Sequence, residues 1–156
     1  MSPSTSASGS KNSEPAGVTK RGIVNLALIE TLAVTEAQQV WARDTFRWAA
    51  ALLDEHRLEN ELLGLLLLQD IMATYLLLWR LGDKARAGDW RLVGPAHRCA
   101  ERLRRLSAAL QRLLLAHAVS PDDFAPRLRS MLARASQTID GVSSQRGTET
   151  RAQIRT

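Results

Sequence analysis

The sequence holds a single cysteine, Cys99, among its 156 residues. One cysteine cannot form a disulfide within the chain, and it cannot supply the several thiolates of a cysteine-built zinc site. A lone cysteine also fits a reducing compartment. Residues 1–17 contain no apolar segment of the kind found in secretory signals, so we expect a cytoplasmic protein.

The motifs of common enzyme sites are missing as well. The chain has no glycine-rich phosphate-binding loop and no nucleophile elbow, and its glycines gather at expected bends and ends. His56 lies beside acidic residues, but no second histidine stands at ligand spacing from it. The sequence therefore predicts a protein that is not an enzyme and that holds neither a metal nor another cofactor.

Aromatic residues are few, at 4% of the chain, but four of the seven are tryptophans between residues 41 and 90. Hydrophobic residues make up 45%, which is the ordinary share for a globular protein. We therefore expect a packed core in this region. The most apolar run, 62–81, carries Gln69 and Asp70 near its centre. An aspartate at the centre of a membrane span costs roughly 2.5–3.5 kcal/mol, so the run predicts a core helix and no membrane contact.

Charge is unevenly distributed along the chain. Residues 1–90 hold nine Lys/Arg and eleven Asp/Glu, a net charge of −2, whereas residues 91–156 hold twelve Arg and five Asp/Glu, a net charge of +7. Such asymmetry is typical of a chain whose basic half meets a polyanion or an acidic protein surface.

Hydrophobic spacing and capping signals predict an all-α fold, a helical hairpin or bundle of four to five helices. Thr35 and Gln38 have the spacing of a capping box, and Pro95 suits the first turn of a helix. The expected helices are 19–32, 36–57, 61–86, 95–118 and 122–135. Composition divides the chain into a disordered segment 1–17, a helical domain 18–135 and a disordered basic tail 136–156.

The helix expected at 61–86 is apolar on most of its circumference. Such a helix is buried between neighbours, either in its own chain or in another subunit. We expect a homo-oligomer whose interface includes Leu66, Asp70, Ile71, Leu77 and Leu78. Asp70 would set the register or pair with an arginine across that interface, or it would simply reach the surface.

The helix expected at 95–118 carries four arginines on one side. At 100° per residue, Arg98, Arg102, Arg105 and Arg112 fall within about 80° of one another. A leucine-rich arc lies beside them. Further along the chain, the positive charge continues with Arg127 and Arg129.

Two interpretations of these six arginines remain open. They form a solvated face that pairs with acidic residues of the same chain, or they bind an external polyanion such as DNA. Guanidinium groups suit phosphate because their planar fork makes bidentate, charge-assisted contacts. The acidic partners expected under the first interpretation are Glu55, Glu59 and Glu61.

Three segments of the chain share a pattern with one known protein family. The first is the helix start with its tryptophan, and the second is a leucine-rich helix with a Tyr before a Trp and an Arg. The third is a proline-started helix with leucine spacing that ends in Ser-Pro and a closing Arg-Leu. In this chain they are 36–41, 65–80, and 94–110 with 119–121 and 127–128. Over about residues 36–132 the chain therefore resembles the small terminase subunits of tailed bacteriophages.

The resemblance implies a helical-hairpin core that assembles into a ring. Proteins of this family bind the packaging-start region of the viral genome and present it to the large terminase subunit, which holds the ATPase and nuclease. The resemblance therefore implies a non-catalytic DNA-binding subunit in the host bacterial cytoplasm. The alternative is a helical adaptor that uses its arginine-rich face to bind an acidic protein.

Overall fold

The computed structural model describes residues 26–58 and 61–153. Within these ranges every regular element is helical and none is a strand, which confirms the predicted all-α fold. The segment 1–17, the start of the first expected helix and the last three residues lie outside these ranges. The elements are α1 (Leu26–Leu32), α2 (Glu36–Glu55), α3 (Leu62–Arg86), the 3-10 turn η1 (Trp90–Leu92), α4 (Val93–Ala116) and α5 (Pro121–Gln153).

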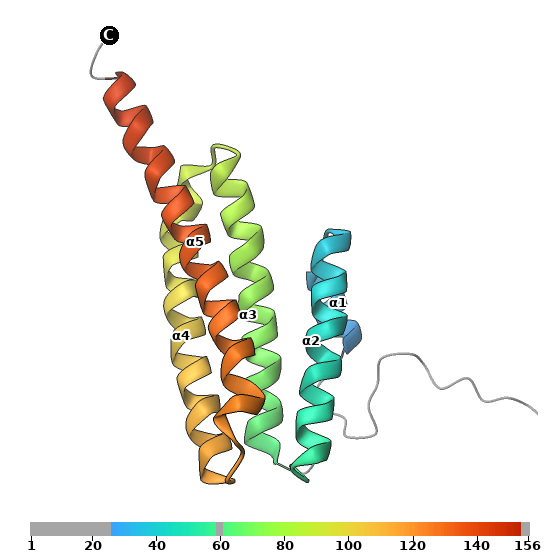
Figure 1. Cartoon of the computed structure of the whole chain (residues 1–156). Coiled ribbons are helices and arrows are strands. Elements are labelled where there is room, and N and C mark those ends of the chain that lie inside the picture. The colour runs from blue at the N-terminus through green and yellow to red at the C-terminus, as the bar shows by residue number, and fades with distance from the viewer. Residues whose placement is uncertain (1–25, 59–60, 154–156) are drawn as a thin grey trace, which may run out of the picture.

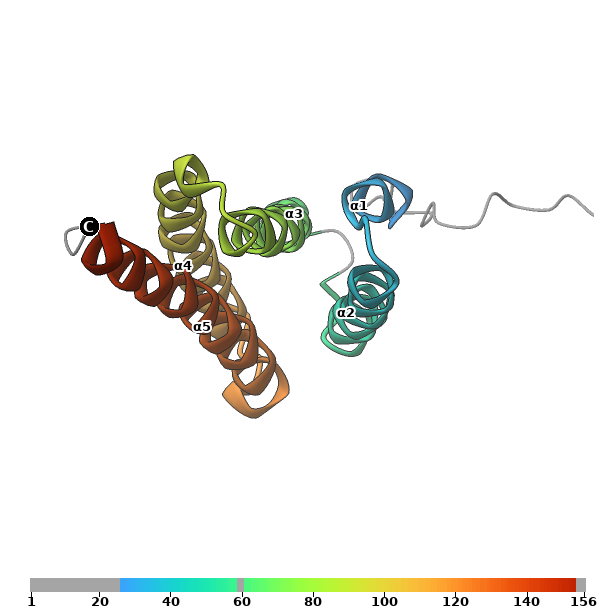
Figure 2. The ribbon, with the colours of Figure 1, turned by 90° about the horizontal axis from the view of Figure 1, so that it is seen from above.

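Helix α3 lies at the centre of the fold. It packs against α4 and α5 on one side and against α1 and α2 on the other, as Figure 1 and Figure 2 show. Of the helices in the described ranges, only α3 is long and apolar enough to cross a membrane, and half of its most apolar window is buried inside the protein. Core helices pass the same test, and this position is the one that the sequence predicts for it.

The main core lies between α3, α4 and α5. It is built from large side chains that repeat at three- and four-residue spacing on the inner face of each helix, which is the pattern of an amphipathic helix. Its fully buried members include Leu68, Ile71 and Leu78 of α3, Leu103, Leu110 and Leu114 of α4, and Phe124 of α5. A smaller cluster joins α1 and α2 to the other side of α3 through Ile29, Ala42, Met72 and Leu76.

Local signals set the helix ends. The predicted capping box is present: Thr35 Oγ1 accepts a hydrogen bond from Gln38 N at 3.3 Å, and Gln38 Oε1 accepts one from Thr35 N at 3.3 Å. Three helices are followed by a residue with positive φ, namely Arg57, Gly88 and Ala118. This backbone conformation turns the chain out of the helix.

Helix α5 is longer than expected. The sequence predicts its end at 135 and a disordered tail beyond, but the helix continues to Gln153. Ala135 and Ile139 extend the buried face of α5, being 4% and 8% exposed. Packing of these residues against the bundle continues the helix through a polar stretch, and its last turns project past the other helices (Figure 1).

Helix α2 touches α5 near one end. Trp48 Nε1 donates a hydrogen bond to Asp123 O at 3.4 Å, and His56 Nε2 lies 3.2 Å from Asp123 Oδ2. Arg127 Nη2 donates to Thr45 Oγ1 at 3.3 Å. Towards the start of α2 the two helices separate, and Figure 2 shows α2 standing apart from α4 and from most of α5.

Candidate functional site

Helix α4 has a buried face and a cationic face. Residues at three- and four-residue spacing pack into the bundle: Ala96, Ala100, Leu103, Ser107, Leu110 and Leu114. This face lies about 160° around the helix from Arg98. Consequently Arg98, Arg102, Arg105 and Arg112, named here the arginine stripe, are all exposed.

The four guanidinium groups of the arginine stripe differ in their partners. Arg102 Nη2 lies 3.3 Å from Asp70 Oδ2, and Arg105 Nε lies 3.3 Å from Glu101 Oε1. In the part of the chain that the structure describes, Arg98 and Arg112 have no ion-pair partner. Two of the four arginines therefore have a carboxylate partner within the chain, and Arg105 shares its partner Glu101 with Arg104.

The acidic partners are not the ones expected from the sequence. Glu61 Oε2 lies 3.3 Å from His117 Nε2, away from the stripe, and Glu59 falls outside the described residues. Asp70 reaches the surface and pairs with an arginine of its own chain. Its side chain is 52% exposed, so this ion pair contributes little to stability.

Arg127 and Arg129 do not extend the arginine stripe as one surface. Arg127 is half-buried and reaches towards α2, where its guanidinium carbon lies 5.8 Å from the centre of the Trp48 ring. Arg129 is exposed and stands about 200° further round α5, because it lies two positions after Arg127. The six arginines proposed for DNA therefore divide into four on α4 and two on opposite sides of α5.

The residues expected at an oligomer interface divide in the same way. Ile71 and Leu78 are 0% and 1% exposed and lie in the core of their own chain. They are therefore not available for contact with another subunit. Leu66 and Leu77 are each 46% exposed. With Leu62 and Leu63 they form an exposed apolar surface on α3, named here the leucine face.

The leucine face borders the arginine stripe. Asp70 lies one turn after Leu66 and two turns before Leu77, so it belongs to the same side of α3. Its ion pair with Arg102 joins that side to α4. The structure therefore places exposed leucines and exposed guanidinium groups next to each other.

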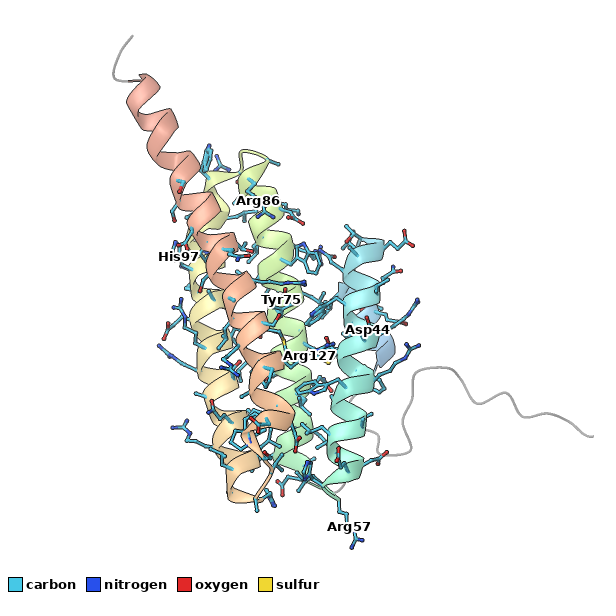
Figure 3. The ribbon with its side chains drawn as sticks, viewed as in Figure 1. Asp44, Arg57, Tyr75, Arg86, His97 and Arg127 are labelled. Carbon is cyan, nitrogen blue, oxygen red and sulfur yellow. The ribbon has the colours of Figure 1, made fainter. Side chains whose placement is uncertain are left out.

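A second feature was missed by sequence reasoning. A groove of about 630 Å³ separates the start of α2 from α5, with α3 as its floor. Figure 3 shows Asp44, Tyr75 and Arg127 around it. The clustering of Trp41 and Trp79 with Tyr75 was a signal for this region, but the sequence alone suggested only a packed core.

In the described ranges, no group of three or more His, Cys, Asp and Glu side chains is placed to hold a metal ion. Cys99 is half-buried and packs against the main core. Burial raises the pKa of its thiol, and the nearby charges of Arg102 and Arg98 oppose this in part. A raised pKa keeps the thiol protonated and weakly reactive.

Three comparisons with known proteins found no relative of this chain. No family model matches the chain, and neither a curated protein nor a solved structure matches it.

Proposed function

We propose that the protein is a non-catalytic DNA-binding protein that associates with copies of itself. The arginine stripe contacts the phosphate backbone, and the leucine face joins the copies. The observation that carries this proposal is the adjacency of the two surfaces, joined through Asp70 and Arg102.

The charge of the stripe suits a phosphate backbone. Arg98 and Arg112 stand fourteen residues apart on one side of α4, which corresponds to about 21 Å along the helix axis. Cations spread over such a length neutralise several phosphates and release their counterions, which drives association with nucleic acid. Neighbouring copies joined through the leucine face would bring several stripes to one duplex and so raise the overall affinity.

The finer role rests on the resemblance of residues 36–132 to small terminase subunits. We propose that the protein acts in the host bacterial cytoplasm, where it recognises viral DNA for packaging and hands it to a large subunit with ATPase and nuclease activity. The ring expected for such proteins needs a self-associating surface, and the leucine face offers one.

One observation favours a second candidate function, that of an adaptor for an acidic protein. Two guanidinium groups of the stripe already contact carboxylates, those of Asp70 and Glu101. Carboxylates of a partner protein would offer the same chemistry. Poly-glutamate is a suitable probe for this alternative.

Fluorescence anisotropy with labelled duplex DNA tests the proposal. The variant R98A/R112A removes the two unpaired guanidinium groups of the stripe. The control variant R43A/R47A removes the same charge from α2, where both arginines are exposed. We expect the stripe variant to bind DNA at least tenfold more weakly than the wild type, and the control to stay within about twofold.

Equal losses in the two variants would show that net charge alone attracts DNA, and the proposed surface would be wrong. Tighter binding to poly-glutamate than to DNA would favour the adaptor. Multi-angle light scattering on the same samples measures self-association, and a monomer of 17.2 kDa at micromolar concentration would remove that part of the proposal.

A further inference from the structure

The groove between α2 and α5 is open to solvent and has an aromatic floor. Tyr75 stacks on Trp41, with ring centroids 4.3 Å apart and planes 28° apart. Trp79 meets Tyr75 edge-on at 6.0 Å. Tyr75 is buried, whereas the two tryptophans are half-buried, so the floor presents apolar indole surface to whatever enters. Aromatic surfaces of this kind dominate binding energy in protein interfaces.

The two walls of the groove carry opposite charges. Glu36 and Asp44 line the α2 side, and Arg127 and Arg134 line the α5 side. No ion pair crosses between these four residues, all of which the structure describes. Asp44 instead faces Arg47 of its own helix at 3.8 Å. Both walls therefore keep charge that a ligand can pair with.

The groove extends beyond this first hollow. A second hollow of about 310 Å³ continues it along α5 and shares Tyr75, Trp79 and Arg134 with it. On α5 the lining extends from Arg127 to Thr138, which is about 16 Å or three helical turns. This length, an apolar floor and charged edges are the features of a groove that receives a helix.

We propose that this groove binds an amphipathic helix of another protein, with acidic residues along one edge and basic residues along the other. The apolar side of that helix covers Trp41 and Trp79. Its acidic edge faces Arg127 and Arg134, and its basic edge faces Glu36 and Asp44. The site is separate from the arginine stripe of α4 and does not depend on DNA binding.

Three labelled helical peptides of about fourteen residues test the proposal with the full chain. All have leucine at the inner positions; one has Glu on one edge and Lys on the other, one has Glu on both edges, and one has Lys on both. Exchanging the two edges would be no control, because a helix can enter the groove in either direction. We expect the mixed peptide to bind at least tenfold more tightly than the other two.

Two kinds of variant locate the binding. Ser130→Trp places a large side chain on the groove wall, and Ala133→Trp places the same side chain at an exposed position that does not line the groove. We expect the first to abolish peptide binding and the second to leave it unchanged. In the variant E36K/D44K both walls are cationic, so the preference should change to the peptide with Glu on both edges.

Several outcomes would overturn the proposal. They are equal binding of the three peptides, no binding at micromolar concentration, and binding that survives Ser130→Trp. If Ser130→Trp lowers the mass of the protein in solution and no peptide binds, the occupant is a second copy of this chain. If indole-3-acetate binds the groove more tightly than every peptide, the occupant is a small aromatic anion.

Discussion

Asp70 and Arg102 join the leucine face of α3 to the arginine stripe of α4. The Oδ2 atom of Asp70 lies 3.3 Å from Nη2 of Arg102, and both side chains are more than half exposed. An ion pair so accessible to water contributes between 0 and about 1 kcal/mol to stability. Its main effect is therefore to neutralise one of the four guanidinium groups that we propose to bind phosphate.

Asp70→Asn should raise the affinity for DNA. The change removes one negative charge from the edge of the stripe and leaves Arg102 available to phosphate. We expect about a threefold tighter complex at low salt and a change of no more than about 1 kcal/mol in the free energy of unfolding. Fluorescence anisotropy measures the affinity for DNA, and urea titration measures the free energy of unfolding. Asp83→Asn is the matched control, because Asp83 pairs with Arg86 away from the stripe, and a weaker complex in Asp70→Asn would contradict the expectation.

Substitutions on α3 should separate self-association from stability. Leu66 and Leu77 are exposed, so the variant L66A/L77A should remain folded. Light scattering should give it a lower molar mass in solution than the wild type. Ile71 is fully buried, and Ile71→Ala should destabilise the fold by about 2–5 kcal/mol. Circular dichroism during thermal unfolding measures stability. Unchanged mass in L66A/L77A would show that the leucine face does not join copies.

Gly82 lets α3 approach α5 closely. A Cβ atom at this position would overlap Cγ2 of Thr138, and Thr138 is held by a hydrogen bond from its Oγ1 to Arg134 O at 2.9 Å. Gly82→Ala should destabilise the protein by about 1–3 kcal/mol. In the variant G82A/T138S the clashing methyl group is gone and the hydroxyl is kept. We expect most of the stability to return, and a double variant as unstable as Gly82→Ala would show that the contact is not the cause.

Tyr75 is the only tyrosine of the chain, so absorbance at alkaline pH follows its ionisation alone. Burial raises its pKa above the ordinary 10.0, while the hydrogen bond and charge of Arg134 lower it in part. Arg134→Ala should therefore move the titration midpoint still higher. In the wild type, the stability due to Tyr75 is fully present below pH 10 and is lost as pH rises through the raised pKa.

Circular dichroism at each pH shows whether the chain is still folded during this titration. A midpoint at or below the ordinary value in the folded wild type would contradict the burial of Tyr75. A downward change in Arg134→Ala would contradict the contact between Arg134 and Tyr75.

Local signals predicted the helices well, because capping and hydrophobic spacing depend on neighbours in sequence. Thr35 and Gln38 form the capping box that their spacing indicated. The predicted end of α5 at residue 135 is wrong, because the apolar side chains of Ala135 and Ile139 continue the helix against the bundle. The polar composition from residue 136 onward predicts a disordered tail, but composition does not record this packing.

Surfaces were harder to predict than helices. On a helix that is leucine-rich all round, sequence cannot separate Leu77, which is exposed, from Leu78, which is buried, until the positions of α4 and α5 are known. Arg127 and Arg129 differ in the same way because neighbouring positions on a helix face different directions. The groove depends on how far α2 stands from α5. This separation is a tertiary property, and the aromatic residues of the region indicate only a packed core.

The salt dependence of DNA binding tests the central claim most directly. Each phosphate that the protein neutralises contributes about −0.9 to the slope of log affinity against log salt concentration. We expect a steep negative slope for the wild type and a slope shallower by about 2 for each bound R98A/R112A chain, because two contacts are lost. A slope near zero, or the same slope in both proteins, would show that the arginine stripe of α4 does not bind the phosphate backbone.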